Sequence, residues 1–259
     1  MPWRSIWMRR PGSIELVIQA AMGGSKLVMS SSRLRVITFD LDDTLWDNKP
    51  VMQRAEHALL LWLRQHYPEV AHVWSRQALQ AFRQRILTAE PDIAHDLAQV
   101  RQRAMVDFAA AVGLGTDWVA PALAHFYQHR HRVTPFPGVP AMLRRLRKRW
   151  LIGAVTNGNA DVSQIGLDDA FDFVIYAAAA GVAKPDIGIF ETALARAGVP
   201  PQAAVHVGDD PVRDIGGALA TGMQAVWINP AAQPWPGGPV PQAIFSDVLA
   251  LEGWLAQAG

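Results

Sequence analysis

Five short apolar segments rich in β-branched residues constrain the fold of this chain more than any other feature. Apolar and polar residues do not alternate within them, which is typical of strands buried on both faces of a parallel sheet. Segments with helical periodicity lie between most of them, and this alternation of strands and helices favours an open, doubly wound α/β sheet. The predicted strands are Leu34–Phe39, Leu151–Thr156, Phe171–Tyr176, Ala203–Val207 and Gln224–Ile228.

One connection in this predicted sheet is far too long to be a loop. It runs from Phe39 to Leu151, and its periodicity is helical from Pro50 to about Arg132. We therefore predict an all-helical domain over residues 46–135, inserted into a core formed by residues 34–45 and 136–259. The predicted helices are Val51–Tyr67, Ala78–Leu87, Leu97–Val112 and Val119–His131 in the insert, and Pro140–Trp150, Ile187–Ala197 and Asp214–Thr221 in the core.

The composition excludes several classes of function. With 24 Lys+Arg, 23 Asp+Glu and a net charge of +1, the chain has no general attraction to nucleic acid or to an anionic membrane. The longest stretch without a charge, residues 215–246, is interrupted by prolines and is not expected to span a membrane. The chain contains no cysteine, which rules out disulfides, thiolate metal sites and a cysteine nucleophile. We expect a cytoplasmic protein that binds neither nucleic acid nor membrane.

Residues 1–33 are predicted to form a poorly ordered extension outside the fold. Arginines precede the apolar segment Ile14–Ala21, as they do in a signal peptide, but Glu15 and Gln19 interrupt that segment. The extension would also be explained if translation naturally began at Met29 and the codon for Met1 were an upstream start.

Polar side chains follow four of the predicted strands, at the edge where open α/β sheets bind their ligands. Each of them alone is more often a turn former, a helix cap or a solvated group. Clustered carboxylates, however, repel one another unless a proton or a divalent cation holds them, so the set as a whole predicts a site. Its members are Asp40 and Asp42, Thr156 and Asn157, Lys184, and Asp209 and Asp214.

Oxygen ligands without His or Cys suit Mg²⁺, which pairs with substrate phosphate. A carboxylate beside this ion can attack phosphorus and form an aspartyl phosphate. A second carboxylate two residues later requires the chain to twist into a turn, where the group is free to protonate a leaving oxygen and later to deprotonate water. Thr156 offers a hydroxyl donor to a phosphoryl oxygen, and Lys184 neutralises phosphoryl charge.

The pattern Asp40-x-Asp42-x-Thr44, Thr156, Lys184-Pro185 and Gly208-Asp209-x-x-x-x-Asp214 resembles the four motifs of the haloacid dehalogenase (HAD) superfamily. The resemblance covers about residues 34–250 and implies a HAD-like Rossmannoid core, in which the helical insert is similar to a C1-type cap. Longer stretches resemble the bacterial HAD phosphatases that act on flavin mononucleotide and on 5-amino-6-(5-phospho-D-ribitylamino)uracil, a riboflavin precursor. These stretches are Thr38–Asn48, Glu90–Asp96, Val155–Asn159, His206–Asp210 and Gly222–Ile228.

The resemblance implies an Mg²⁺-dependent phosphomonoester hydrolase of a small phosphorylated metabolite. Dehalogenases and phosphonatases of the superfamily lack an acid at the position of Asp42, so its presence favours phosphate esters. The implied roles are as follows: Asp40 is nucleophile and metal ligand; Asp42 is general acid/base, with its backbone carbonyl on the metal; Thr156 and Asn157 hold the phosphoryl group; Lys184 steadies nucleophile and phosphate; Asp209 binds the metal; and Asp214 supports the metal shell.

The insert is rich in aromatic residues that could stack on a flat heterocycle, although their helical spacing places most of them in the insert's own core. Trp46, directly after the first motif, is the one predicted to reach the substrate. Arg101, Arg103 and His95 suit either a polar substrate or a solvated helix face. Other functions remain open: a sugar phosphomutase, a nucleotide or sugar-phosphate phosphatase of the same superfamily, or a non-enzymatic phospho-acceptor signalling or binding module.

Overall fold

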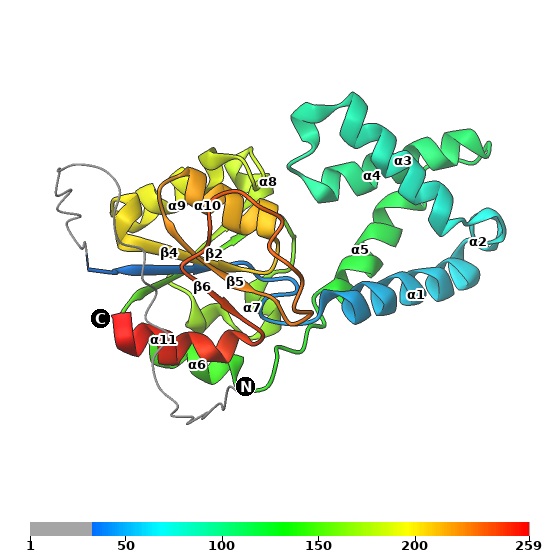
Figure 1. Ribbon diagram of the computed structural model, residues 1–259. Helices are drawn as coiled ribbons and strands as arrows, with labels where there is room; N and C mark the ends of the chain where they lie inside the picture. The colour runs from blue at the N-terminus through cyan, green and yellow to red at the C-terminus, as the bar shows by residue number, and fades with distance from the viewer. Residues whose placement is uncertain (1–32, 259) are drawn as a thin grey trace, which may run out of the picture. The chain divides into compact units, whose positions relative to one another are not determined.

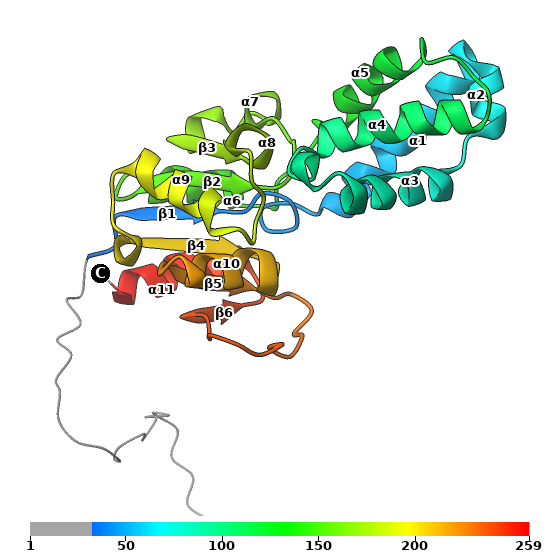
Figure 2. The same cartoon turned by 90° about the horizontal axis from the view of Figure 1, so that it is seen from above.

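A computed structural model describes residues 33–258, so the extension predicted over residues 1–33 lies, except for Arg33, outside the described residues. Six parallel strands form one sheet in the order β3-β2-β1-β4-β5-β6 (Figures 1 and 2). This arrangement confirms the predicted doubly wound α/β fold. The strands are β1 Val36–Phe39, β2 Leu151–Thr156, β3 Phe173–Tyr176, β4 Ala204–Gly208, β5 Gln224–Ile228 and β6 Ala243–Phe245.

Five α-helices lie between β1 and Val139, and we call them the inserted helices. They are α1 Asn48–His66, α2 Pro68–Val73, α3 Arg76–Ala89, α4 Leu97–Ala111 and α5 Val119–Arg130. The remaining helices follow or connect the strands. They are α6 Val139–Leu146, α7 Val162–Ile165, α8 Ala177–Ala180, α9 Ile187–Ala197, α10 Gly217–Ala220 and α11 Leu251–Ala258. No helix in the described part of the chain combines the length and hydropathy of a membrane span.

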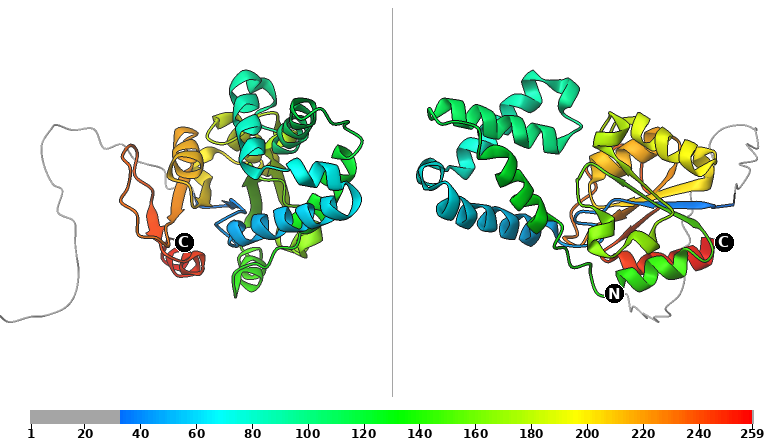
Figure 3. Two further views of the ribbon diagram at one scale, coloured as in Figure 1. Left: turned by 90° about the vertical axis from the view of Figure 1, so that its right-hand side faces the viewer. Right: turned by 180° about the vertical axis from the view of Figure 1, so that it is seen from behind.

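Helices cover both faces of the sheet. On one face, α6 and α11 bury Leu143 and Leu255 in a cluster that includes Phe39 of β1. On the other face, Phe190 of α9 is buried in a cluster with Val155 of β2. Figure 3 shows α6 and α11 together on one side of the sheet and α9 on the other. Burial of both faces explains why apolar and polar residues do not alternate along the strands.

The inserted helices have an apolar core of their own. Helix α1 packs against α5, and α3 packs against α4 (Figure 2). Leu59 of α1, Phe108 of α4 and Phe126 of α5 are almost fully buried in this core, together with Trp118. Most of the aromatic residues of the insert therefore pack inside it, as predicted. All five helices lie within residues 46–135, and the division of the chain into two domains stays a prediction.

The structure corrects several of the predicted element boundaries. Strand β6 was not predicted, because its three residues follow a proline-rich stretch and carry little periodicity. Helix α2 was not predicted either. The helix predicted from Asp214 begins instead as a π-helical turn over Pro211–Gly216, which Asp210 caps through the backbone N–H groups of Val212 and Arg213. The helix predicted over Pro140–Trp150 ends at Leu146.

A tight packing contact on β2 leads to a stability prediction. A Cβ atom at Gly153 would overlap the ring of Phe173 on the neighbouring strand β3. We expect Gly153→Ala to lower the free energy of unfolding by about 1–3 kcal/mol through overpacking. The control Gly253→Ala adds a Cβ in open space on α11 and should raise that free energy by up to about 1 kcal/mol. Urea denaturation measures both changes, and equal effects would contradict the packing argument.

Candidate active site

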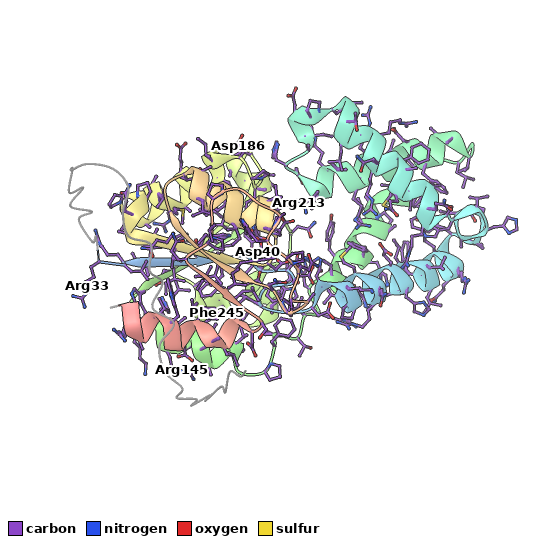
Figure 4. All side chains as sticks on the ribbon, in the orientation of Figure 1. Arg33, Asp40, Arg145, Asp186, Arg213 and Phe245 are labelled. Atoms are coloured by element: carbon purple, nitrogen blue, oxygen red, sulfur yellow. The ribbon has the colours of Figure 1, made fainter. Side chains whose placement is uncertain are left out.

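The candidate site begins at the carboxyl end of β1. The Asp40 N–H donates to the Val207 carbonyl of β4 at 2.9 Å, which continues the sheet to this residue. The chain then turns away at Asp43, whose φ is 62°, and the Asp43 N–H donates to the Trp46 carbonyl at 2.8 Å. Asp42 therefore lies in a turn, as the two-residue spacing from Asp40 predicts. Figure 4 labels Asp40 at this edge of the sheet.

Lys184 lies at the centre of the site, and its side chain is 3% exposed. Its Nζ donates to Asp40 Oδ1 and to Asp214 Oδ1 at 2.6 Å each, and to the Val155 carbonyl at 2.8 Å. Three acceptors match the three N–H groups of an ammonium. The structure thus joins the first, third and fourth predicted motifs through one buried charge.

Asp209 completes an acidic cluster beside this lysine. Carboxylate oxygens of Asp40, Asp209 and Asp214 all lie within 4.8 Å of one another. The Thr44 hydroxyl donates to Asp209 Oδ1 at 3.2 Å, and the Trp227 indole N–H donates to the Asp209 carbonyl at 2.7 Å. Residues from three strand ends and one loop therefore converge as the sequence predicts.

The two residues predicted to hold a phosphoryl group have different surroundings. The Thr156 hydroxyl accepts the Gly158 N–H at 3.0 Å, and the residue lines the cavity beside Asp40. The Asn157 amide bonds instead to the backbone of Lys184, donating to its carbonyl at 2.9 Å and accepting its N–H at 2.8 Å. Both ends of this amide are used, so the side chain of Asn157 positions Lys184; the residue also lines the cavity, and its role in phosphate binding stays a prediction.

Trp46 also has a different place from the predicted one. It is fully buried, so it offers no surface on which a substrate could stack. Its indole Nε1 donates to Asp42 Oδ1 at 2.8 Å. The Nη2 group of Arg130, on α5, donates to Asp42 Oδ1 at 2.9 Å and to Oδ2 at 2.6 Å. The prediction that Trp46 contacts substrate is therefore wrong, and both residues hold Asp42 instead.

Two adjoining cavities open over these groups. The first, of about 210 Å³, is lined by every predicted site residue except Trp46. The second, of about 310 Å³, shares Asp42, Asn48, Leu97 and Gly158 with the first and extends along the inserted helices. Arg101 lines this second cavity with its guanidinium 4.0 Å from the centre of the Phe126 ring, whereas Arg103 is exposed and pairs with Asp107. The site therefore has a charged end and a larger chamber beside it.

A family model described as "haloacid dehalogenase-like hydrolase" matches residues 34–222. The chain belongs to this family. It is 35% identical over 227 residues to the 5-amino-6-(5-phospho-D-ribitylamino)uracil phosphatase YigB of Escherichia coli strain K12, covering 85% of this chain and 95% of that protein. It is 27% identical to the phosphoserine phosphatase of Thermus thermophilus, covering 78% of this chain and 91% of that protein.

Among solved structures, the chain is similar to the crystal structure of a 2-haloacid dehalogenase from Pseudomonas syringae pv. Tomato DC3000. The TM-score is 0.82 at 37% identity, and the match covers 87% of this chain and all of that one. This similarity confirms the predicted fold. The family model and the two phosphatases named above confirm the predicted HAD-type phosphatase, a phosphoric monoester hydrolase.

The charges of this HAD site explain why it suits a divalent cation. Burial raises the pKa of Asp40 well above its ordinary value, although Lys184 opposes this shift. Burial and the charges of Asp214 and Asp43 raise the pKa of Asp209 to about 7. Burial also raises the pKa of Asp214, but Lys184 and His206 outweigh burial and bring it below the ordinary value. The cluster thus holds more acidic groups than its one ammonium can neutralise, and its oxygen ligands are those that Mg²⁺ prefers.

Sequence patterns assign no role to two residues that the structure brings to the site. His206 is fully buried on β4, where Nε2 lies 3.3 Å from Asp214 Oδ1 and Nδ1 lies 2.9 Å from the Thr38 hydroxyl. The Asp210 N–H also donates to Asp214 Oδ2 at 3.0 Å, so both oxygens of Asp214 are engaged within the protein. Arg130 is the other residue, and no motif marks it.

We expect Mg²⁺ to raise the melting temperature more at about pH 8 than at about pH 6. Below a pKa of about 7, the metal must first displace a proton from Asp209. Mg²⁺ at about 100 times its dissociation constant adds about 2.7 kcal/mol to the free energy of unfolding. Calorimetry of the metal-free protein with and without Mg²⁺ measures this rise. Asp209→Asn should lose it, whereas Asp247→Asn, at an exposed helix cap, should keep it. Equal rises in melting temperature at both pH values in the unsubstituted protein would contradict the prediction that Asp209 binds the metal.

Proposed function

We propose that this protein is an Mg²⁺-dependent phosphomonoesterase that forms an aspartyl phosphate on Asp40. The observation that carries the proposal is the convergence of Asp40, Lys184 and Asp209 at one cavity, with Asp42 lining the same cavity. Asp40, Asp209 and the backbone carbonyl of Asp42 would hold the metal. When bound, Mg²⁺ supplies positive charge opposite the phosphoryl oxygens. Asp214 holds Lys184 through Oδ1, and its Oδ2, which accepts the Asp210 N–H, would support the metal shell.

The reaction takes two steps. In the first, an Asp40 carboxylate oxygen bonds to phosphorus while the bond from phosphorus to the ester oxygen breaks, and Asp42 gives its proton to the departing oxygen. In the second, a water oxygen bonds to phosphorus, the bond to Asp40 breaks, and Asp42 takes the proton of the water. Lys184 neutralises phosphoryl charge in both steps, and the Thr156 hydroxyl donates a hydrogen bond to a phosphoryl oxygen. The products are an alcohol and phosphate, and both carboxyl groups return to their starting states.

The leaving group occupies the second cavity. Among the described side chains, two buried polar atoms have no hydrogen-bond partner, Asn48 Oδ1 and Arg130 Nη1, and both residues line this cavity. One is an acceptor and the other a donor, so a leaving group that carries hydroxyl groups satisfies both. Gln80, Gln84 and Arg101 add further polar groups to the walls.

A ribityl chain ending in a polar heterocycle has this chemistry. Together with the 35% identity to the uracil-derivative phosphatase YigB, it supports 5-amino-6-(5-phospho-D-ribitylamino)uracil or flavin mononucleotide as the substrate. The inserted helices would then form the cap that covers the substrate. The lack of cysteine fits the proposed cytoplasmic location.

Phosphate release by the purified protein tests this proposal. We expect release from these two riboflavin-pathway esters to exceed that from phosphoserine and pyrimidine nucleotides, and a chelator should stop it. Chloride release from 2-chloropropanoate tests for dehalogenase activity. We expect no chloride release, because the proton that Asp42 donates is needed by an oxygen leaving group and not by chloride. Chloride release without phosphate release would overturn the proposal.

Asp40→Asn should lower phosphate release by at least about 10⁴-fold, because the amide is no nucleophile toward phosphorus. Asp186→Asn is the matched control, since Asp186 is an exposed helix cap and asparagine caps equally well. In the unsubstituted enzyme, acid quenching during turnover should leave phosphate on the peptide that contains Asp40. Full activity of Asp40→Asn would exclude the proposed nucleophile.

A further inference from the structure

The two oxygens of Asp42 have unequal surroundings. Oδ1 accepts from both Trp46 Nε1 and Arg130 Nη2, so both of its lone pairs are used. Oδ2 accepts only from Arg130 Nη2, at 2.6 Å. A Cβ atom at Gly158 would contact both Asp42 Oδ2 and the Thr156 hydroxyl. Oδ2 therefore lies against the loop that lines the first cavity, with one lone pair free.

The donors of this carboxylate come from different parts of the fold. Trp46 follows the motif that contains Asp42, whereas Arg130 ends α5, the last of the inserted helices. Arg130 is 2% exposed, and its Nη2 uses one hydrogen for each oxygen of Asp42. A buried ion pair contributes little net stability, so stability alone does not account for an arginine at this position.

We propose that Trp46 and Arg130 are positioning residues that hold both oxygens of Asp42 so that the one free lone pair, on Oδ2, is the position that carries the proton. This inference rests on the proposed function, because it concerns the proton transfers to the leaving oxygen and from water. The proton leaves Oδ2 as the bond from phosphorus to the ester oxygen breaks, and it returns to Oδ2 from the attacking water. Because Arg130 belongs to the inserted helices, the arrangement is complete only while these helices hold it against Asp42.

Leaving-group chemistry separates this role from a structural one. An alkyl phosphate such as flavin mononucleotide releases an alkoxide, which needs a proton in the transition state. p-Nitrophenyl phosphate releases a stable phenolate, which does not. A residue that acts through Asp42 affects the first substrate far more than the second. A residue that only supports the fold affects both equally.

The test compares kcat/KM for these two substrates in a set of variants. Trp46→Phe removes one N–H and keeps a buried ring, and we expect it to lower the alkyl phosphate value about fivefold to tenfold. Arg130→Met should lower that value by about 100-fold, as Asp42→Asn does. Because Arg130 Nη1 also faces the leaving group, the double variant described below separates proton transfer from substrate binding. Each variant should keep the p-nitrophenyl phosphate value within about threefold, because kcat/KM reports the steps up to release of the phenolate and not the later hydrolysis of the phosphoenzyme, in which Asp42 acts as base. Arg132→Met, an exposed control two residues away, should change neither value.

A double variant supplies the second readout. If Arg130 acts through Asp42, Asp42→Asn with Arg130→Met loses no more activity than Asp42→Asn alone. Equal losses on both substrates in Trp46→Phe and Arg130→Met, or additive losses in the double variant, would overturn the inference while the phosphatase assignment stands. Hydrolysis of neither substrate by the unsubstituted enzyme would instead reject the proposed function.

Discussion

The ammonium group of Lys184 is the constraint on which the site depends. It bonds at 2.6 Å to both Asp40 and Asp214, and Asp209 lies in the same acidic cluster. Two buried carboxyl groups and a half-buried one around one cation leave negative charge that is costly away from water. The parallel sheet creates this arrangement, because strands that run in one direction all end at the same edge. A further cation would lower the free energy of this site by neutralising the remaining negative charge. A phosphate ester bound to that cation would then lie beside the carboxylate of Asp40.

Much of this arrangement follows from local sequence signals. Buried strands of a parallel sheet are continuously apolar, so β2 and β5 were predicted with their observed bounds. Asp40, Lys184 and Asp209 were predicted to share a site because each follows a strand of the same sheet. The short strand β6 gives no such signal, since three residues after a proline-rich stretch carry neither length nor periodicity.

The errors arise where a side chain's role depends on tertiary packing. Trp46 follows the motif directly, yet its ring is buried and its indole N–H holds Asp42. Arg130 lies in a helix and carries no motif, and only the packing of α5 brings it to the carboxylate. The sequence around His206 predicts a buried strand, and the contact of His206 with Asp214 depends on the turn that follows β4. Sequence patterns therefore locate the reacting groups, while the residues that orient them emerge only from the folded chain.

The most direct test of the central claim is a crystal structure of the protein with Mg²⁺ and beryllium fluoride, a mimic of the phosphoryl group. The account predicts beryllium bonded to a carboxylate oxygen of Asp40, Lys184 and Thr156 against the fluorides, and Mg²⁺ coordinated by Asp40 and Asp209. Beryllium fluoride on another residue, or Mg²⁺ bound away from these two carboxylates, would contradict it.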